Sequence, residues 1–292
     1  MILTPILATG LNGLVGSKLS QDLADRYQFD NLDLRDERRP VDITQTDQVE
    51  AAISRSPAQF LIHLAAFTNV STAWNERGQK DGLCYQVNVE GTRNIAQACL
   101  RHNKHLIHIS TAYVFDGQKT GLYTEDDPVK PIEWYGQTKA WAEEVVENLD
   151  GLKWTILRID QPFRSDPFTK LDIVHRLIES IKRGDLYPQF TDHYFGPTFI
   201  DDFVKVIDLI IKQQVTGLFH ASSGEQWTDY DFAKLIAQHI DPNFTVEPGN
   251  LAEYLKSSQR PYQKNTAMSV DKLKAQLNFE LTPISQALQS ID

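Results

Sequence analysis

Apolar residues follow two alternating patterns along this chain. Short apolar runs typical of buried strands occur at Ile6–Thr9, Phe29–Leu34, Phe60–Ala66, Lys104–Ile109 and Trp154–Ile159. Apolar residues elsewhere recur every three or four positions, which predicts helices over Asp47–Ser54, Asn88–Arg101, Trp134–Leu149, Leu171–Lys182, Phe203–Ile211, Tyr230–His239 and Val270–Leu277. Strands that alternate with helices indicate right-handed crossovers, so the predicted fold class is α/β with a doubly wound parallel sheet.

The Pro-rich, irregular segment from Asp160 to Pro167 marks the point where the chain leaves this sheet. We therefore expect a first domain over residues 1–160 and a smaller C-terminal lobe over residues 161–195 and 221–292. Residues 196–220 are predicted to return to the first domain, because Gly217–His220 has the pattern of a further strand.

Two details of helix position also follow from the sequence. Thr44 or Thr46 is expected to cap the helix near Asp47. Past residue 133, a buried stripe is predicted for Trp134, Thr138, Trp141, Val145 and Leu149, with Tyr135 and Lys139 on a neighbouring face.

Composition excludes several classes of protein. The net charge is −10, and an acidic surface repels phosphate backbones, so no nucleic acid partner is expected. No apolar run approaches the roughly 18 residues of a membrane span, and Met1–Leu7 leads into a glycine motif, so we expect a cytoplasmic protein without a leader or a membrane partner. Two cysteines cannot form a disulfide framework, and no metal site is predicted.

The glycine motif follows the first strand. Gly10, Gly13 and Gly16 have the spacing G-x-x-G-x-x-G, and Leu19 and Leu23 then continue at helical spacing. Glycines in such a turn let backbone N–H groups approach a pyrophosphate at the helix N-terminus, where the helix dipole favours negative charge. Strand, turn and helix together predict a dinucleotide site.

The second strand supplies groups that would select the dinucleotide. Asp33 stands about twenty residues beyond the glycines, where an acidic residue binds a ribose 2′-hydroxyl, and this favours NAD. Arg35, Arg38 and Arg39 follow and could bind a 2′-phosphate, which favours NADP. The predicted cofactor is therefore NAD or NADP.

Four candidate site residues fall just past the carboxyl ends of predicted strands, namely Gly10, Asp33, Ala66 and Thr111. Ligands of parallel sheets bind at that edge. Small side chains after the third strand would let a flat ligand lie against the backbone. His63, inside that strand, is interpreted as a packed core residue.

Thr111, Tyr135 and Lys139 predict the chemistry. A tyrosine phenol has a pKa near 10, and an ammonium at about 4 Å and an effective dielectric constant near 20 stabilises the phenolate by roughly 4 kcal/mol before desolvation. Lys139 stands one helical turn after Tyr135, and the Thr111 hydroxyl could orient a carbonyl oxygen towards the phenol. The expected reaction is carbonyl reduction, with hydride from a nicotinamide and the proton from Tyr135.

Nearly the whole chain resembles the extended short-chain dehydrogenases/reductases, and most of all the dTDP-4-dehydrorhamnose reductase family. The shared motifs are Gly10-x-x-Gly13-x-x-Gly16, Asp42-Ile43, Ala65-Ala66-x-Thr68, Asn88, Ser110-Thr111-x-Tyr113-Val114-Phe115, Tyr135-x-x-x-Lys139, Gly196-Pro197-Thr198 and Arg260-Pro261. The resemblance implies a Rossmann-like fold whose cofactor is bound by Gly10, Leu11, Asn12, Gly13, Gly16, Asp33, Arg35, Asp42, Ile43, Leu64, Ala65, Ala66, Thr68, Asn88, Tyr135 and Lys139. It implies catalysis by Thr111, Tyr135 and Lys139, and a C-terminal lobe that binds a nucleotide-sugar or related ketone.

Three positions depart from the family pattern. Ala112 stands where the reductases carry Asp. Ser71 and Thr72 stand where they carry a Lys or an acidic pair, and Gln161 stands where they carry Trp. The resemblance assigns these positions to the sugar site, so we expect a sugar other than the rhamnose precursor.

Two alternative functions stay open. A nucleotide-sugar epimerase would keep its cofactor bound and unreduced through turnover, whereas dehydration is disfavoured because Ala112 and Tyr113 replace the Asp–Glu pair of dehydratases. A non-catalytic NAD(P)-binding regulatory subunit would keep the fold without turnover. The amphipathic segments Tyr85–Arg101 and Trp134–Leu149 would also allow a homodimer.

Overall fold

A parallel sheet forms the centre of the computed structural model, which describes residues 3–36 and 39–291. Its six strands are β1 (Thr4–Thr9), β2 (Tyr27–Leu32), β3 (Phe60–His63), β4 (His105–Thr111), β5 (Lys153–Ile159) and β10 (Gly217–His220). Their order is β10-β5-β4-β3-β1-β2, and every neighbouring pair is parallel. β2 lies on one side of β1 and β3 lies on the other, so the order in which strands are added to the sheet reverses at β1. Ligands of such sheets bind beyond the carboxyl ends of the strands at this point.

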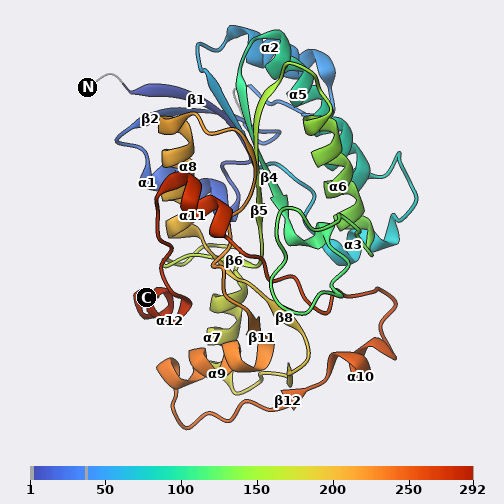
Figure 1. Cartoon of the computed structure of the whole chain (residues 1–292), viewed down its shortest axis with the longest axis vertical. Helices are drawn as coiled ribbons and strands as arrows, with labels where there is room; N and C mark the ends of the chain where they lie inside the picture. The colour runs from blue at the N-terminus through green and yellow to red at the C-terminus, as the bar shows by residue number, and fades with distance from the viewer. Residues whose placement is uncertain (1–2, 37–38, 292) are drawn as a thin grey trace.

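Helices cover both faces of this sheet (Figure 1). One face carries α1 (Leu14–Asp22), α8 (Ile200–Gln213) and α11 (Asp271–Leu277), and the other carries α2 (Thr46–Arg55), α5 (Thr92–Arg101) and α6 (Trp134–Glu147). Each face has its own apolar cluster, since the buried strand residues alternate between the two sides. The predicted doubly wound, Rossmann-like α/β fold is confirmed.

A smaller lobe lies beyond the carboxyl end of the sheet, below it in Figure 1. Its helices are α7 (Ile173–Arg183), α9 (Asp229–Ile240), α10 (Leu251–Leu255) and α12 (Ile284–Ala287), followed by the 3₁₀ turn Leu288–Ser290. Short strands pair as β6 (Pro162–Phe163) with β9 (Thr198–Phe199), β7 (Gln189–Phe190) with β12 (Pro248–Gly249) and β8 (Tyr194–Phe195) with β11 (Trp227–Thr228). Phe195 and Phe232 are fully buried in the apolar cluster that holds this lobe together.

The connection between β3 and α5 differs from the prediction. It contains α3 (Val70–Asn75), α4 (Leu83–Tyr85) and the π-helical segment Gln86–Gly91, so the helix expected to begin at Asn88 begins at Leu83. A π-helical turn shifts the phase of the side chains, which a three-or-four-residue spacing cannot reveal. A separate 3₁₀ turn, Ala112–Val114, follows β4.

Three other helix predictions were wrong in detail. α2 starts after Gln45 without a capping side chain, because the hydroxyls of Thr44 and Thr46 bond Asp42 and Asn94 instead. α8 starts at Ile200 rather than Phe203. In α6, Trp134 and Thr138 of the predicted stripe are buried, whereas Trp141, Val145 and Leu149 are only half-buried. The buried positions also include Tyr135, Lys139, Ala142 and Val146.

α11 also differs from the predicted division of the chain. Residues 221–292 were assigned to the smaller lobe, but Leu273 and Leu277 of α11 lie in the apolar cluster of α1 and α8 on the main sheet. The predicted return of Gly217–His220 to that sheet is seen as β10, which pairs with β5. Among the described residues, no helix is both long and apolar enough for a membrane span.

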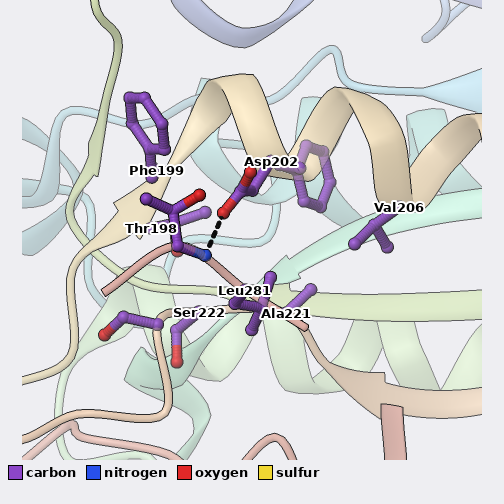
Figure 2. A pocket seen from close by; sticks show the side chains of 10 residues that line it. Thr198, Phe199, Asp202, Val206, Ala221, Ser222 and Leu281 are labelled. Carbon is purple, nitrogen blue, oxygen red and sulfur yellow. Dashed lines mark hydrogen bonds between the residues drawn. The ribbon is translucent and has the colours of Figure 1, made fainter. Parts of the chain in front are cut away.

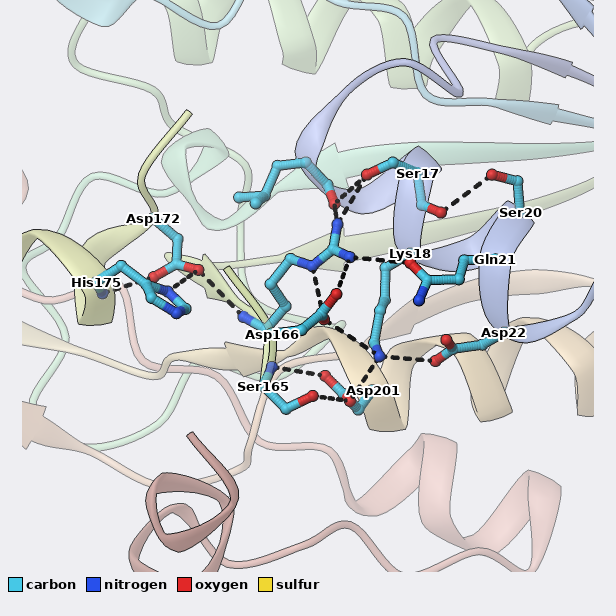
Figure 3. A network of polar contacts seen from close by, with 12 residues as sticks. Ser17, Lys18, Ser20, Gln21, Asp22, Ser165, Asp166, Asp172, His175 and Asp201 are labelled. Carbon is cyan, nitrogen blue, oxygen red and sulfur yellow. Dashed lines mark hydrogen bonds and ion pairs between the residues drawn. The ribbon is translucent and has the colours of Figure 1, made fainter. Parts of the chain in front are cut away.

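Buried charges join α1 to the segment that leads into the smaller lobe (Figure 3). Arg164 is 2% exposed and donates to both carboxylate oxygens of Asp166, at 2.9 and 2.6 Å, and to Ser17 Oγ at 2.8 Å. Lys18 Nζ lies 3.3 Å from Asp166 and 3.2 Å from Asp201. Because Arg164 follows β6 and Asp201 opens α8, this network fixes α1 against both elements.

We expect Arg164→Ala to lower the free energy of unfolding by about 2–4 kcal/mol, since it leaves Asp166 without its bidentate partner in a largely buried network. Denaturant unfolding measures the change. The matched control is Arg183→Ala, because Arg183 also pairs with a nearby Asp and Glu but is exposed, and its loss should not move the midpoint. Equal midpoints for the two variants would contradict the importance of the network.

Candidate active site

The glycine motif forms a tight turn between β1 and α1. Gly10 has φ +73°, in the left-handed region, and its carbonyl oxygen accepts a hydrogen bond from Gly13 N at 3.0 Å. A Cβ on Gly16 would lie 2.4 Å from that oxygen, and a Cβ on Gly10 would lie 2.8 Å from Ala65 N. Only glycine lets the backbone segments approach so closely, and the turn brings β1, β3 and α1 together.

The first turn of α1 is suited to an anion. Gly13 is its N-cap, no side chain caps it, and no acidic residue lies in the first turn. The N–H groups of that turn therefore keep their partial positive charge for a ligand. Leu11 contributes only backbone here, because its side chain is buried in the core, whereas Asn12 is exposed.

Asp33 lies beside this turn. Its carboxylate accepts hydrogen bonds from Asn12 Nδ2 at 3.0 Å and from Arg35 N at 2.8 Å. Arg35 and Arg39 are both exposed, and Arg38 lies outside the described residues. The structure thus brings the acidic candidate and two of the basic candidates for ribose recognition to the same place.

Other predicted cofactor residues line the adjoining loops. Asp42 Oδ1 accepts from Thr44 N at 2.9 Å, and the Ile43 side chain is buried against Gly91. Leu64 N and Ala65 N donate to Thr9 Oγ1 at 3.2 and 3.0 Å. In the same loop Ala66 is half-buried and Thr68 is exposed.

Asn88 ties this loop to α6. Its Oδ1 accepts from Phe67 N at 2.8 Å, and its Nδ2 donates to Phe67 O at 3.2 Å and to Thr138 Oγ1 at 3.0 Å. The amide is therefore engaged by the protein on both sides. In this arrangement Asn88 positions the loop and α6 rather than offering a free group to a cofactor.

Thr111 and Tyr135 meet where β4 ends and α6 begins. Burial raises the pKa of the Tyr135 phenol above its ordinary value, the charge of Glu133 adds to this, and a hydrogen bond with the Thr111 side chain acts in the opposite direction. Glu133 caps α6 and accepts from Tyr135 N at 2.8 Å and Gly136 N at 2.5 Å. The phenol is therefore protonated at neutral pH and able to donate.

Lys139 corrects one electrostatic expectation. Its side chain is 2% exposed, and Nζ donates to Ile109 O at 2.8 Å and to His108 Nε2 at 3.2 Å. Burial lowers the pKa of Lys139 to about 8. The sequence predicted that this ammonium would lower the pKa of Tyr135, but its hydrogen bonds go to β4, and the phenol pKa lies above its usual value.

Asp160 is a further candidate site residue, which the sequence analysis did not single out. It follows Ile159 of β5, which pairs with Thr111, and its Oδ2 accepts from Thr266 Oγ1 at 2.6 Å. Its Oδ1 is buried without a hydrogen-bond partner among the described residues, and burial raises the pKa of Asp160 to about 6. The next residue, Gln161, has φ +38°, which is uncommon outside glycine. A carboxyl group directly after a largely apolar strand was the available signal.

Ala112, which the resemblance assigned to the sugar site, has a buried and apolar environment. Its side chain is fully buried in a cluster with Val114, Phe115, Tyr123, Ala140 and Met268. A carboxylate there would be desolvated among apolar groups, so alanine suits the position. Ser71 and Thr72 are exposed at the start of α3, and Gln161 is half-buried.

Two cavities elsewhere lack Tyr135 in their lining. The first, of about 10 Å³, lies under α8 and has room for about one water molecule. Figure 2 shows it beside the hydrogen bond from Thr282 N to the Asp202 carboxylate, which is 2.5 Å long. The second is an open hollow of about 520 Å³ on the smaller lobe, lined in part by Trp227 and Lys234. The candidate site is therefore defined by the sheet edge.

Comparison with known proteins gives consistent matches over almost the full length. The family model described as RmlD substrate binding domain matches residues 4–291. A dTDP-4-dehydrorhamnose reductase of Aggregatibacter actinomycetemcomitans is 30% identical, and the match covers 98% of this chain and 97% of the relative. A probable low-salt glycan biosynthesis reductase of Haloferax volcanii is 26% identical, and the match covers 97% of this chain and 96% of the relative. The crystal structure of dTDP-4-dehydrorhamnose reductase from Bacillus anthracis in complex with NADP has a TM-score of 0.88 at 26% identity and covers 99% of this chain and 98% of its own.

The Glu133 cap should make stability depend on pH. Burial raises the pKa of Glu133 to about 7, above its ordinary 4.5, so the folded protein binds this proton more tightly than the unfolded chain. The free energy of unfolding should therefore fall as pH rises from about 4.5 to about 7. Glu133→Gln should remove this part of the fall in denaturant unfolding curves. Glu144→Gln, at an exposed position of the same helix, is the control, and identical pH profiles for the two variants would refute the prediction.

Proposed function

The chain belongs to the RmlD substrate binding domain family, and we propose that it is an NAD(P)H-dependent reductase of the keto group of a nucleotide-sugar. One observation carries this proposal. A threonine hydroxyl and a tyrosine phenol meet at the end of β4, one helical turn from a buried lysine, on the sheet edge that also holds the glycine turn. The names of the full-length relatives support the same reaction class.

The coenzyme would be held by backbone groups of the glycine turn and by Asp33. The fit rests on the glycine turn, in which Gly13 is the exposed N-cap of α1, and on the first turn of α1, which no side chain caps. Residues 1–160 with 196–220 would bind this group, and the smaller lobe would bind the substrate. Reduced nicotinamide, when bound, supplies hydride.

Tyr135 would supply the proton to the substrate oxygen. Its raised pKa keeps the phenol protonated at neutral pH, which a proton donor for reduction requires. The Thr111 hydroxyl would hold the same oxygen in line with the phenol. Lys139 would hold the nicotinamide ribose, with β4 as its support.

The sugar would be read in part by Asp160 and Gln161. Asp160 Oδ1 is free for a hydrogen bond within the described structure, and Gln161 places an amide where the family carries an aromatic ring. Polar groups at this strand end would recognise a hydroxyl or amino substituent near the reacting carbon. This supports a sugar other than the rhamnose precursor.

Tyr135→Phe should lower kcat for reduction of a keto nucleotide-sugar by about 10²–10⁴-fold while the coenzyme still raises the melting temperature. NAD(P)H oxidation followed by absorbance measures the change. Tyr27→Phe removes a phenol that bonds Asp208 far from this sheet edge and should leave kcat unchanged. Full activity in Tyr135→Phe would overturn the assignment. Wild-type protein that binds dinucleotide but never turns over would instead support the regulatory-subunit alternative.

Asp33→Ser should increase the affinity for NADP relative to NAD by about tenfold, because it removes a carboxylate that repels a 2′-phosphate while Arg35 remains. Dissociation constants for both dinucleotides measure the ratio. Asp25→Ser, at an exposed position just before β2, is the matched control. An unchanged ratio in Asp33→Ser would show that Asp33 does not contact the ribose.

A further inference from the structure

His108 is a buried histidine in β4 with an unusual set of contacts. Its Nε2 lies 3.2 Å from Lys139 Nζ. An ammonium has only donors, so Nε2 is the acceptor, and the imidazole is neutral with its proton on Nδ1. That Nδ1 is buried and has no hydrogen-bond partner in the described part of the chain.

Two neighbouring histidines show how packing alone satisfies an imidazole. His63, whose ring centroid is 5.3 Å from that of His108, bonds Thr9 Oγ1 at 2.7 Å and Thr92 Oγ1 at 3.1 Å. His105, three residues earlier on β4, bonds Thr155 Oγ1 at 2.8 Å. His108 instead leaves a buried N–H unpaired, which costs stability that an apolar residue would not lose. The interaction that an apolar residue could not provide at this position is the hydrogen bond that the imidazole accepts from Lys139.

We propose that His108 is a positioning residue for Lys139, which accepts a hydrogen bond from the buried ammonium and holds it, charged, against β4. With Ile109 O as the second acceptor, two of the three ammonium protons are directed to the strand. The third is left for a ribose hydroxyl or for the phenol. This inference rests on the proposed function, in which Lys139 contacts the coenzyme.

The surroundings of Lys139 and His108 determine which of these two side chains titrates in the working pH range. Burial lowers the pKa of Lys139 to about 8, and the charge of Glu143 acts in the opposite direction. Burial raises the pKa of the nearby Cys84 thiol to about 11, so this group is uncharged where Lys139 titrates. Glu143 is itself paired with Arg158 at 2.7 Å. Burial holds the pKa of His108 well below its usual range, and the charge of Lys139 and, to a smaller extent, electrostatic interaction with His63 act in the same direction. His108 therefore stays neutral, and it acts by setting the pH at which Lys139 loses its proton.

Removal of the acceptor should shift the alkaline limb of the kcat profile. A lost hydrogen bond to the charged form lowers the pKa of an amine, so in His108→Leu this limb should move down by about one pH unit. kcat should then fall roughly tenfold at alkaline pH and much less on the acid side of the limb. His108→Gln keeps an acceptor and should restore most of the wild-type profile.

The matched control is His105→Leu, which removes a buried imidazole from the same strand without touching Lys139. It should leave the alkaline limb where it is in the wild type. The same shift in His105→Leu and His108→Leu would overturn the proposal, since the effect would then come from the strand rather than from the acceptor.

A second measurement needs no turnover and uses wild-type protein with ¹⁵N-labelled histidine. The NMR spectrum should show His108 neutral from pH 6 to 9 with the proton on Nδ1, and Lys139→Met should move its Nε2 resonance. A proton on Nε2, or no response to Lys139→Met, would refute the contact. If no keto nucleotide-sugar is reduced, the proposed function fails, but this spectrum still decides the role of His108.

Discussion

A buried ammonium is the constraint on which this site depends. Lys139 is 2% exposed, and its described hydrogen bonds go to neutral acceptors, the Ile109 carbonyl and His108, rather than to a carboxylate. An isolated charge in such a place costs several kcal/mol, so α6 is stable only where β4 presents those acceptors. Because Tyr135 stands one turn before Lys139, the same requirement fixes the phenol next to Thr111.

The backbone of the sheet edge imposes a second constraint of the same kind. The close contact of Gly10 with Ala65 ties β1 to the loop after β3, and Asn88 ties that loop to α6 through Phe67 and Thr138. A shift in the glycine turn would therefore be passed to the helix that carries Tyr135. The proposed cofactor cradle and the proposed proton donor form one connected unit, which suits a reaction that needs both in register.

Local signals account for what the sequence could predict. Short apolar runs located the main strands, and the glycine spacing and the Tyr135–Lys139 pair indicated the candidate site, because each depends on neighbours in the chain. The contacts that were missed depend on distant partners. A long lysine side chain can reach several acceptors, and only the fold shows that His108 is one of them. Ala112 similarly looked like a sugar-site change until its apolar neighbours were seen. α11 carries an ordinary helical pattern that does not reveal which apolar face it covers.

The protonation of the buried groups favours one direction of the proposed reaction. Burial raises the pKa of Tyr135, of Glu133 to about 7 and of Asp160 to about 6, so this region carries less negative charge than its acidic residues would suggest. A neutral phenol is ready to donate a proton, as reduction requires, whereas oxidation of an alcohol would need a phenolate. Positive charge brought close to the phenol would lower its pKa, as the Thr111 hydrogen bond does in part, and Lys139 is the nearby candidate. While that ammonium is held by His108 and Ile109, the resting site is set for reduction.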